Sequence, residues 1–208
     1  GTGETRQGYL AAFDATTGQP SDRYSADLSF QCTGEKCPNV EDPAVRATVL
    51  SPDGNTLYVG GDFNRVDGRV TNYIARFDTA TGEYLGSMGG GRGTDGPVHS
   101  LTLSPDGATL YVGGTFKRAG DQTRRFVAAF DVASRTVVPG FAPRIEEKLW
   151  DKENLRVIAL GVSRNGRNVL VGGTFGRSNG RAVQGFTAVS AATGKNLQGR
   201  WKEPYLRG

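Results

Sequence analysis

Short stretches in which apolar and polar residues alternate follow one another along most of the chain, separated by turns rich in Pro, Asp and Gly. The clearest stretch, residues 98–103 (Val-His-Ser-Leu-Thr-Leu), has the period of two that is typical of a β-strand with one buried face. Residues 104–107 (Ser-Pro-Asp-Gly) predict a turn, because Pro presets its first corner and Gly accepts a positive φ. Residues 109–112 return as a second strand, and residues 126–130 and 135–138 supply a third and a fourth. The pattern therefore predicts four antiparallel strands in about 53 residues.

This unit recurs along the chain. Each copy has a Ser-x-x-Gly turn, an apolar strand, a Gly-Gly pair and a Phe, and the three copies are residues 50–63, 103–116 and 162–175. From Gly60 to Gly113 is 53 residues, and from Gly113 to Gly172 is 59. A strand-rich unit repeated at such a long period is the signature of a β-propeller, in which each repeat is one blade. We therefore expect an all-β fold of four-stranded antiparallel blades.

Two motifs also resemble the repeats of known families. Residues 57–63 (Leu-Tyr-Val-Gly-Gly-Asp-Phe) and 73–82 (Tyr-Ile-Ala-Arg-Phe-Asp-Thr-Ala-Thr-Gly) resemble the repeat of bacterial secreted β-propeller proteins of the delta-60 type, with a Gly-Gly pair similar to that of kelch repeats. The Ser-Pro-Asp-Gly hairpins resemble those of YVTN-type and TolB-type propellers. The resemblance implies the fold more specifically than the activity, because such propellers serve in adhesion, carbohydrate binding, assembly and occasionally catalysis.

Aligning the repeats divides the chain into about three and a half blades. The expected divisions are a half blade with a cysteine loop (residues 1–39) and three blades (residues 40–92, 93–148 and 149–208). A half blade leaves strand edges unpaired, which soluble proteins avoid. We therefore expect this segment to belong to a larger ring of about seven blades, completed by the remainder of the parent propeller. A compact ring of four blades is the alternative.

Composition narrows the choice of partners only slightly. The formal net charge is +4, which is too small an excess to indicate nucleic acid, and no nucleic-acid-binding motif is present. No run approaches the roughly 18 apolar residues that a membrane span needs. No secretory leader is visible, but a mature or trimmed chain would have lost one.

Cys32 and Cys37 are the only cysteines, and they lie close together in a polar segment. The simplest interpretation is a small loop disulfide, which suits a secreted or cell-surface protein in an oxidising compartment. Half of a metal site is an alternative, although no second cysteine pair is present to complete it. A reduced pair without a role is the other alternative.

The loops that join the second strand of each blade to the third are basic. In a propeller, equivalent loops fall on one face, so these residues predict a positive rim able to attract an anionic ligand or partner. Trp150, in a long loop on the same side, is a candidate to stack on a sugar ring or anchor a protein partner. The candidate binding residues are Arg65, Arg69, Arg118, Arg124, Arg125, Trp150, Arg177 and Arg181. Two alternatives stay open: acidic residues of the same loops pair with the arginines, and Trp150 packs beneath its own loop.

The sequence favours a binding scaffold over an enzyme. His99 is the only histidine, so neither a Ser-His-Asp triad nor a histidine-rich metal site is predicted. The glycine run at residues 89–93 resembles a phosphate-binding loop only weakly, since it lacks the Lys-Ser/Thr pair. We expect no catalytic residue, metal or cofactor here. The predicted function is a non-catalytic secreted scaffold for recognition or assembly that binds a protein or a cell-surface glycan through its long loops. The alternative is part of a lactonase, glycosidase or quinoprotein-like propeller whose catalytic residues lie mostly elsewhere.

Overall fold

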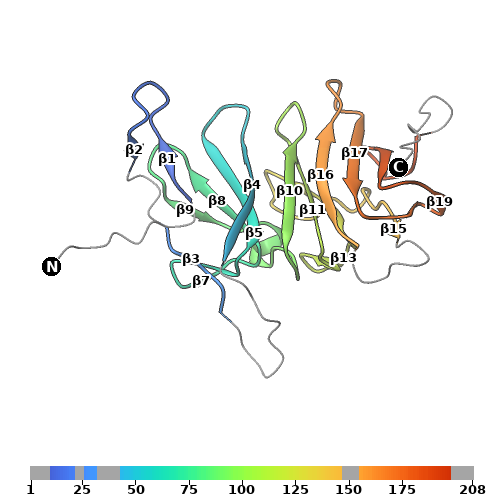
Figure 1. Cartoon of the computed structure of the whole chain (residues 1–208), viewed down its shortest axis with the longest axis horizontal. Coiled ribbons are helices and arrows are strands. Elements are labelled where there is room, and N and C mark those ends of the chain that lie inside the picture. Colours follow the sequence, from blue (N-terminus) through green and yellow to red (C-terminus); the bar gives the residue numbers. More distant parts are fainter. Residues whose placement is uncertain (1–9, 22–25, 32–42, 147–154, 198–208) are drawn as a thin grey trace.

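The computed structural model describes residues 10–21, 26–31, 43–146 and 155–197. Within these ranges the chain contains only strands, turns and one 3₁₀ turn, Gly89–Gly91. The strands form three main antiparallel sheets that stand side by side (Figure 1). The predicted all-β propeller fold is confirmed.

Each main sheet is one blade, and its strands are paired in chain order. In each blade a short hairpin is inserted between the second and the third strand. The first blade comprises β4 (Ala44–Leu50), β5 (Thr56–Asp62), β8 (Ile74–Asp78) and β9 (Tyr84–Gly86). The second comprises β10 (Val98–Leu103), β11 (Thr109–Gly114) and β14 (Val127–Asp131), and the third β16 (Val157–Val162), β17 (Asn168–Gly173) and β20 (Phe186–Ser190). Before the first blade, β1 (Ala12–Phe13) and β2 (Pro20–Ser21) form a short hairpin.

Among the residues that the structure describes, the fourth strand is a full strand only in the first blade. In the second blade it is reduced to a single bridge between Phe130 and Val137, and in the third to one between Val189 and Asn196. The sequence predicted a strand from residue 135, but Arg135 has a φ of 60° and belongs to the turn. Pro139 follows shortly afterwards and has no N–H to donate to a sheet. The fourth strand of the second blade is therefore confined to the residues around Val137.

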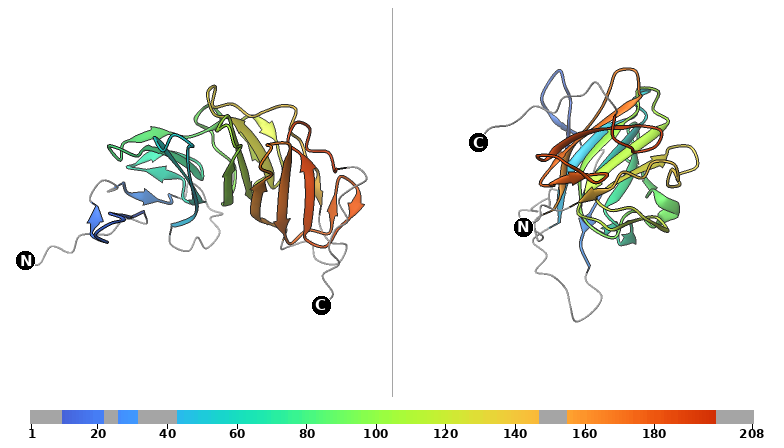
Figure 2. Two further views of the ribbon diagram at one scale, coloured as in Figure 1. Left: turned by 90° about the horizontal axis from the view of Figure 1, so that it is seen from above. Right: turned by 90° about the vertical axis from the view of Figure 1, so that its right-hand side faces the viewer.

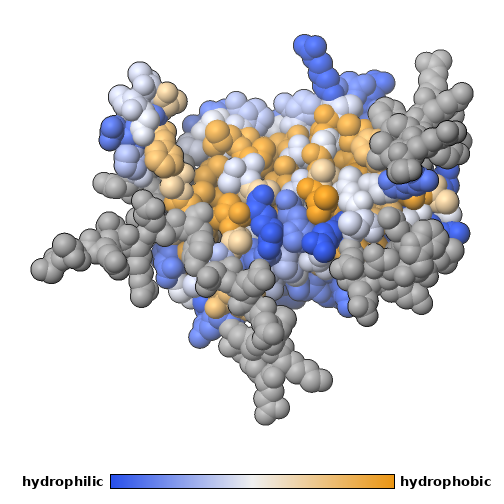
Figure 3. All heavy atoms as spheres, viewed as in Figure 1, coloured by the Kyte–Doolittle hydropathy of each residue, from blue (hydrophilic) through white to orange (hydrophobic). Residues whose placement is uncertain are grey.

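The blades stand in an arc, with the first strand of each blade on its inner side (Figure 2). Strand β10 contacts both β4 of the preceding blade and β16 of the following one. These three inner strands face the viewer in Figure 1, and hydrophobic residues cover much of the same face in Figure 3. This is the radial arrangement of a propeller, with blades packed face to face.

The hydrophobic core is divided into layers between successive blades. In β11, Leu110 and Val112 belong to the layer shared with the first blade, whereas Tyr111 belongs to the layer shared with the third. Phe130 and Phe77 are fully buried in the layers on the preceding sides of their blades. Each central strand is therefore apolar on both faces, because alternate side chains pack against different neighbours.

In the first two blades, the first glycine of the Gly-Gly pair lets the next blade approach. A Cβ on Gly60 would lie 2.5 Å from Val98 Cγ1, and one on Gly113 would lie 2.6 Å from Val157 Cγ1. Both valines are fully buried and belong to the first strand of the following blade. The repeated glycine therefore has a packing role between blades.

The second glycine serves the pairing within a blade. A Cβ on Gly61, Gly114 or Gly173 would lie 2.0–2.1 Å from a backbone oxygen of the segment just before or at the start of the same blade's first strand. Opposite each Gly-Gly pair that strand has a β-bulge, which brings its backbone close. A side chain at the second glycine would therefore prevent the pairing itself.

Candidate functional site

The segments joining the second and third strands, expected to be polar loops, are short β-hairpins. They pair β6 (Arg65–Val66) with β7 (Arg69–Val70), β12 (Arg118–Ala119) with β13 (Gln122–Thr123), and β18 (Arg177–Ser178) with β19 (Arg181–Ala182). In the first and third hairpins both turn residues have positive φ: 49° and 74° at Asp67 and Gly68, and 47° and 79° at Asn179 and Gly180. Such two-residue turns match the twist of paired strands, and Asp-Gly and Asn-Gly are their usual sequences. We call these three hairpins together the hairpin rim.

Each hairpin also pairs with the connection that enters its blade from the preceding one. Strand β3 (Leu28–Ser29) pairs with β6, and β15 (Ile145–Glu146) pairs with β18. In the second blade the same place is taken by a single bridge between Thr94 and Ala119. The two kinds of loop therefore lie on one side of the molecule, as the repeat predicted.

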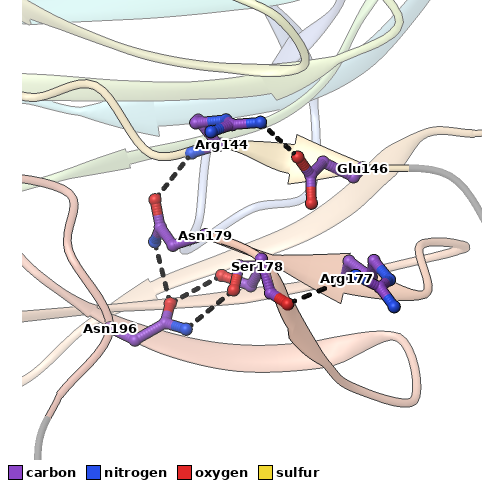
Figure 4. A network of polar contacts seen from close by, with 7 residues as sticks. Arg144, Glu146, Arg177, Ser178, Asn179 and Asn196 are labelled. Carbon is purple, nitrogen blue, oxygen red and sulfur yellow. Dashed lines mark hydrogen bonds and ion pairs between the residues drawn. The ribbon is translucent and has the colours of Figure 1, made fainter.

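Side-chain hydrogen bonds fix the third hairpin in place (Figure 4). Asn179 Oδ1 accepts a hydrogen bond from the backbone N–H of Arg144 at 3.1 Å, and Asn179 Nδ2 donates to Gly194 O at 2.9 Å. Asn196 Nδ2 donates to Ser178 O at 2.8 Å, while Ser178 Oγ donates to Asn196 Oδ1 at 2.7 Å. The hairpin is thereby tied to the entering connection and to the end of its own blade.

Three of the predicted binding arginines stabilise their own hairpins. Arg65 Nη1 donates to Gly68 O at 2.8 Å, Arg118 Nη2 to Asp121 O at 2.6 Å, and Arg177 Nη1 to Gly180 O at 3.4 Å. The three side chains occupy equivalent positions, and each reaches across the turn to a backbone carbonyl. Their repetition along the chain therefore has a structural explanation.

Arg124 and Arg125 lie at the base of the second hairpin. Arg124 donates to Thr123 O and to Pro139 O, both at 2.9 Å, and burial lowers the pKa of its guanidinium. Arg125 lies over the ring of Phe126, 5.6 Å from its centre, and this contact leaves the residue exposed. Arg124 thus links the second hairpin to Pro139, which follows the bridge between Phe130 and Val137.

Arg69 and Arg181 differ from the other predicted arginines. Both follow the turn glycine of their hairpins, and both are exposed. Neither donates a side-chain hydrogen bond to another residue in the part of the chain that the structure describes. Their charges are therefore available to a partner.

The acidic side chains described near the rim make other contacts. Asp95 Oδ1 accepts hydrogen bonds from the backbone N–H groups of Lys117 and Arg118 at 2.7 and 2.8 Å. Glu146 pairs with Arg144 at 2.7 Å. Within the described ranges, neither neutralises an arginine that the sequence proposed for binding. Trp150, Cys32 and Cys37 lie outside the described residues.

The glycine run does not present a free set of backbone amides. Gly91 N and Gly93 N both donate to Met88 O, and Arg92 N donates to Gly89 O. Gly90 N donates to Arg135 O in the second blade. A Cβ on Gly93 would lie 2.0 Å from Asn72 O, so this segment is packed tightly against the first blade. Its glycines thus have a structural role.

Two features are absent from the described residues. No cluster of three or more His, Cys, Asp or Glu side chains that could hold a metal ion is found among them. The same part of the chain contains no helix with the length and apolarity needed to cross a membrane.

Comparison with known proteins supports a propeller repeat. Residues 51–82, which contain β5, the first hairpin and β8, match the family described as "Domain of unknown function (DUF5122) beta-propeller". A 122-residue segment is 29% identical to WD repeat-containing protein 1 of Gallus gallus, covering 56% of this chain and 17% of that protein. The Xenopus tropicalis protein of that name is 30% identical over 122 residues, covering 56% of this chain and 18% of the relative. The matched segment thus spans less than a fifth of either relative. These similarities support a propeller generally and do not single out the bacterial secreted subtype.

Proposed function

We propose that this chain is a protein-interaction scaffold whose hairpin rim contacts an acidic surface of a protein partner. The observation that carries this proposal is the pair of exposed arginines, Arg69 and Arg181, at equivalent positions on hairpins of different blades. Their guanidinium groups make no side-chain hydrogen bond within the described structure, whereas Arg65 and Arg177 beside them serve the turns. Arginines on a rigid framework are well suited to carboxylates, because the guanidinium can bind both oxygens.

The rigidity of the rim supports the same proposal. Asn64 Oδ1 accepts from Gln31 N, and Asp67 Oδ1 from Asp27 N, both at 2.8 Å, which ties the first hairpin to its entering connection. Asn179 does the same in the third blade. A surface that is already ordered loses little conformational entropy when it binds.

Affinity capture with matched variants tests this function. The double variant R69Q/R181Q removes two rim charges, while R164Q/R167Q removes two charges from the turn between β16 and β17, at the opposite end of the blade. We expect proteins captured by the unchanged chain to be lost with R69Q/R181Q and retained with R164Q/R167Q. Equal capture by both variants would contradict the proposed rim.

We further propose that another blade of the same kind packs against the third blade and continues the ring. Tyr58 and Tyr111 are buried between successive blades, but Leu170, at the equivalent register position, is half-buried. A Cβ on Gly172 would meet only Ala159 of its own blade among the described residues, at 3.3 Å. By contrast, Gly60 and Gly113 are each packed against a valine of the next blade.

Light scattering on the purified chain tests this completion. An assembly larger than the 22.1 kDa chain, or a complex with a companion fragment, is expected. The variant L170R places a charge on the proposed interface and should reduce that assembly to the single chain. A stable single chain with no companion, before any substitution, would rule out the larger ring.

A secreted location remains part of the proposal, and it rests on the cysteine pair. Cys32 and Cys37 would form a disulfide in an oxidising compartment. Intact mass after alkylation without a reductant tests this: we expect no alkylation of the exported protein. Alkylation at both cysteines would contradict it. The expected glycan ligand rested on Trp150, which lies outside the described residues. The described arginines of the hairpin rim suit a protein partner, which we therefore favour.

A further inference from the structure

The first strand of every blade carries a β-bulge at the same place. The register passes from Val45 to Ala47 in β4, from Val98 to Ser100 in β10, and from Val157 to Ala159 in β16. The extra residues are Arg46, His99 and Ile158. A bulge redirects the side chain of the extra residue, and bulges are frequent beside functional sites. We call these three residues, together with Arg156 just before β16, the bulge row.

The bulge row lies across the inner strands of three successive blades. Strands β4, β10 and β16 are neighbours, so equivalent positions on them follow one another around the inner side of the arc. Ile158 is 53% exposed, the side chain of Arg46 is 43% exposed, and Arg156 is exposed. Figure 3 shows a hydrophilic group of residues within a largely hydrophobic face over these strands. The inner surface thus combines charge with exposed apolar groups.

The charged residues of the bulge row differ in the contacts that they make. Arg46 forms an ion pair with Asp62, donating from Nε to Oδ2 at 2.6 Å. Arg156 is fixed at its backbone, where its N–H donates to Thr174 Oγ1 at 3.1 Å. Burial is the main reason why the pKa of His99 is lowered, and Arg46 is the second. Asp62 raises this pKa, whereas Arg156 lowers it further. Both guanidinium groups therefore act on this imidazole, against one carboxylate.

We propose that the bulge row binds an acidic side chain of an extended, partly apolar peptide segment from a protein partner. Arg156 would donate hydrogen bonds to the carboxylate, with the nearby charge of Arg46 adding attraction, His99 would donate its ring N–H, and Ile158 would contact the neighbouring apolar side chains. Peptide chemistry fits the surface better than a free phosphate does, because the charged groups lie among exposed apolar residues (Figure 3). This surface differs from the hairpin rim and its binding does not depend on Arg69 or Arg181.

Binding of a defined peptide tests the proposal. The probe is a fluorescein-labelled hexapeptide with two central glutamates flanked by leucines, and the matched probe has glutamines in their place. Fluorescence anisotropy with the full chain should show binding of the glutamate peptide and at least about tenfold weaker binding of the glutamine peptide, which is typical of a charge-assisted hydrogen bond. Equal binding of the two peptides, or no binding of either, would overturn the proposal.

Matched variants locate the site. R156Q should weaken binding of the glutamate peptide about tenfold, whereas R167Q, at the other end of the same blade, should leave it unchanged. I158S should weaken binding of this probe while leaving its preference over the glutamine peptide in place. R69Q/R181Q should bind the probe normally, so the failure of the hairpin rim and the failure of the bulge row are distinguishable. Unchanged binding by R156Q, or displacement of the probe by inorganic phosphate at equal concentration, would contradict the assignment.

Discussion

Val157 of the third blade lies directly over Gly113 of the second, with its Cγ1 only 2.6 Å from the place where a Cβ on Gly113 would be. Val98 has the same relationship to Gly60, one blade earlier, at 2.5 Å. Successive blades therefore meet at one repeated contact between a glycine and a valine. This contact explains why the first two blades have a glycine at this position.

The substitution G113A should destabilise the protein. The new methyl group must displace Val157, and overpacking of this kind costs about 1–3 kcal/mol. G172A is the matched control, because among the described residues its Cβ would meet only Ala159 of the same blade, at 3.3 Å from Cβ and 3.8 Å from the backbone oxygen. Urea unfolding should show a clearly larger loss of stability for G113A than for G172A. Equal losses would show that the contact with Val157 is not the reason why Gly113 resists substitution.

The second glycine should tolerate substitution less well. A Cβ on Gly114 would lie 2.0 Å from Pro97 O, and a backbone oxygen cannot be moved without disturbing the bulge. We expect G114A to cost roughly 4 kcal/mol or more, or to prevent folding. V157A should partly rescue G113A and should not rescue G114A, and urea unfolding of the double variants measures both effects. Rescue of G114A by V157A would contradict the separate roles of the two glycines.

Asn179 should be needed for the third hairpin. It combines a φ of 47° with hydrogen bonds to Arg144 N, Gly194 O and Asn196 Oδ1. Alanine tolerates this backbone conformation poorly and makes none of these bonds, so N179A should cost about 2 kcal/mol. N179D keeps an acceptor for Arg144 N and should cost less. Thermal unfolding measures both variants, and equal stability of N179A and the unchanged protein would contradict the network in Figure 4.

Acid should weaken the turns that follow the third strands. Asp78 Oδ1 accepts hydrogen bonds from the backbone N–H groups of Thr81 and Ala80 at 2.8 and 2.9 Å. The bond from Thr81 N is the main reason why the pKa of Asp78 lies below its ordinary value of 3.8. Because the folded pKa is the lower one, this stabilisation is present above pH 3.8 and is lost as the pH falls through the folded value.

The variant D78N tests this pH dependence, since its amide keeps an acceptor oxygen but does not titrate. Urea midpoints measured between about pH 2 and pH 5 should fall less steeply for D78N than for the unchanged protein. The same slope in both proteins would contradict a lowered pKa at Asp78.

His99 should titrate below its ordinary pKa of 6.5 in the folded protein. Burial disfavours the charged imidazole, and Arg46 disfavours it further. The stability contributed by neutral His99 is therefore present above pH 6.5 and is lost as the pH falls towards the lower folded pKa. NMR titration of the imidazole protons measures that pKa directly. R156Q should raise it, and a midpoint at or above 6.5 in the unchanged protein would contradict the proximity of the arginines.

The repeat predicted the blades because every copy contains the same local signals. The Ser-x-x-Gly turn and the alternating strand each have a local physical cause, and the Gly-Gly pair recurs with them, so three copies were enough to predict the fold. The hairpins of the rim were missed, although Asp67-Gly68 and Asn179-Gly180 are typical of tight hairpin turns. Their strands have only two residues each, too few for a period to be visible.

The candidate site was harder to predict than the fold. Arg65 and Arg69 look alike in the sequence, but one binds its turn carbonyl and the other points to solvent. This difference depends on the direction of the side chain within the hairpin. The bulge row could not be predicted from the sequence either. A bulge is defined by the register between two paired strands, and the pattern of one strand does not show it. His99 was assigned to a strand correctly, but nothing in the sequence indicated that Arg46 and Arg156 lie close to it.

The contact between blades is open to direct measurement by NMR. With the valine methyl groups and glycine α-protons assigned, the account predicts strong nuclear Overhauser effects between Val98 and Gly60 and between Val157 and Gly113. These pairs are 38 and 44 residues apart in the chain, so only blades packed side by side bring them together. Assigned resonances without either cross-peak would contradict the radial packing of the repeats, and with it the hairpin rim and the bulge row.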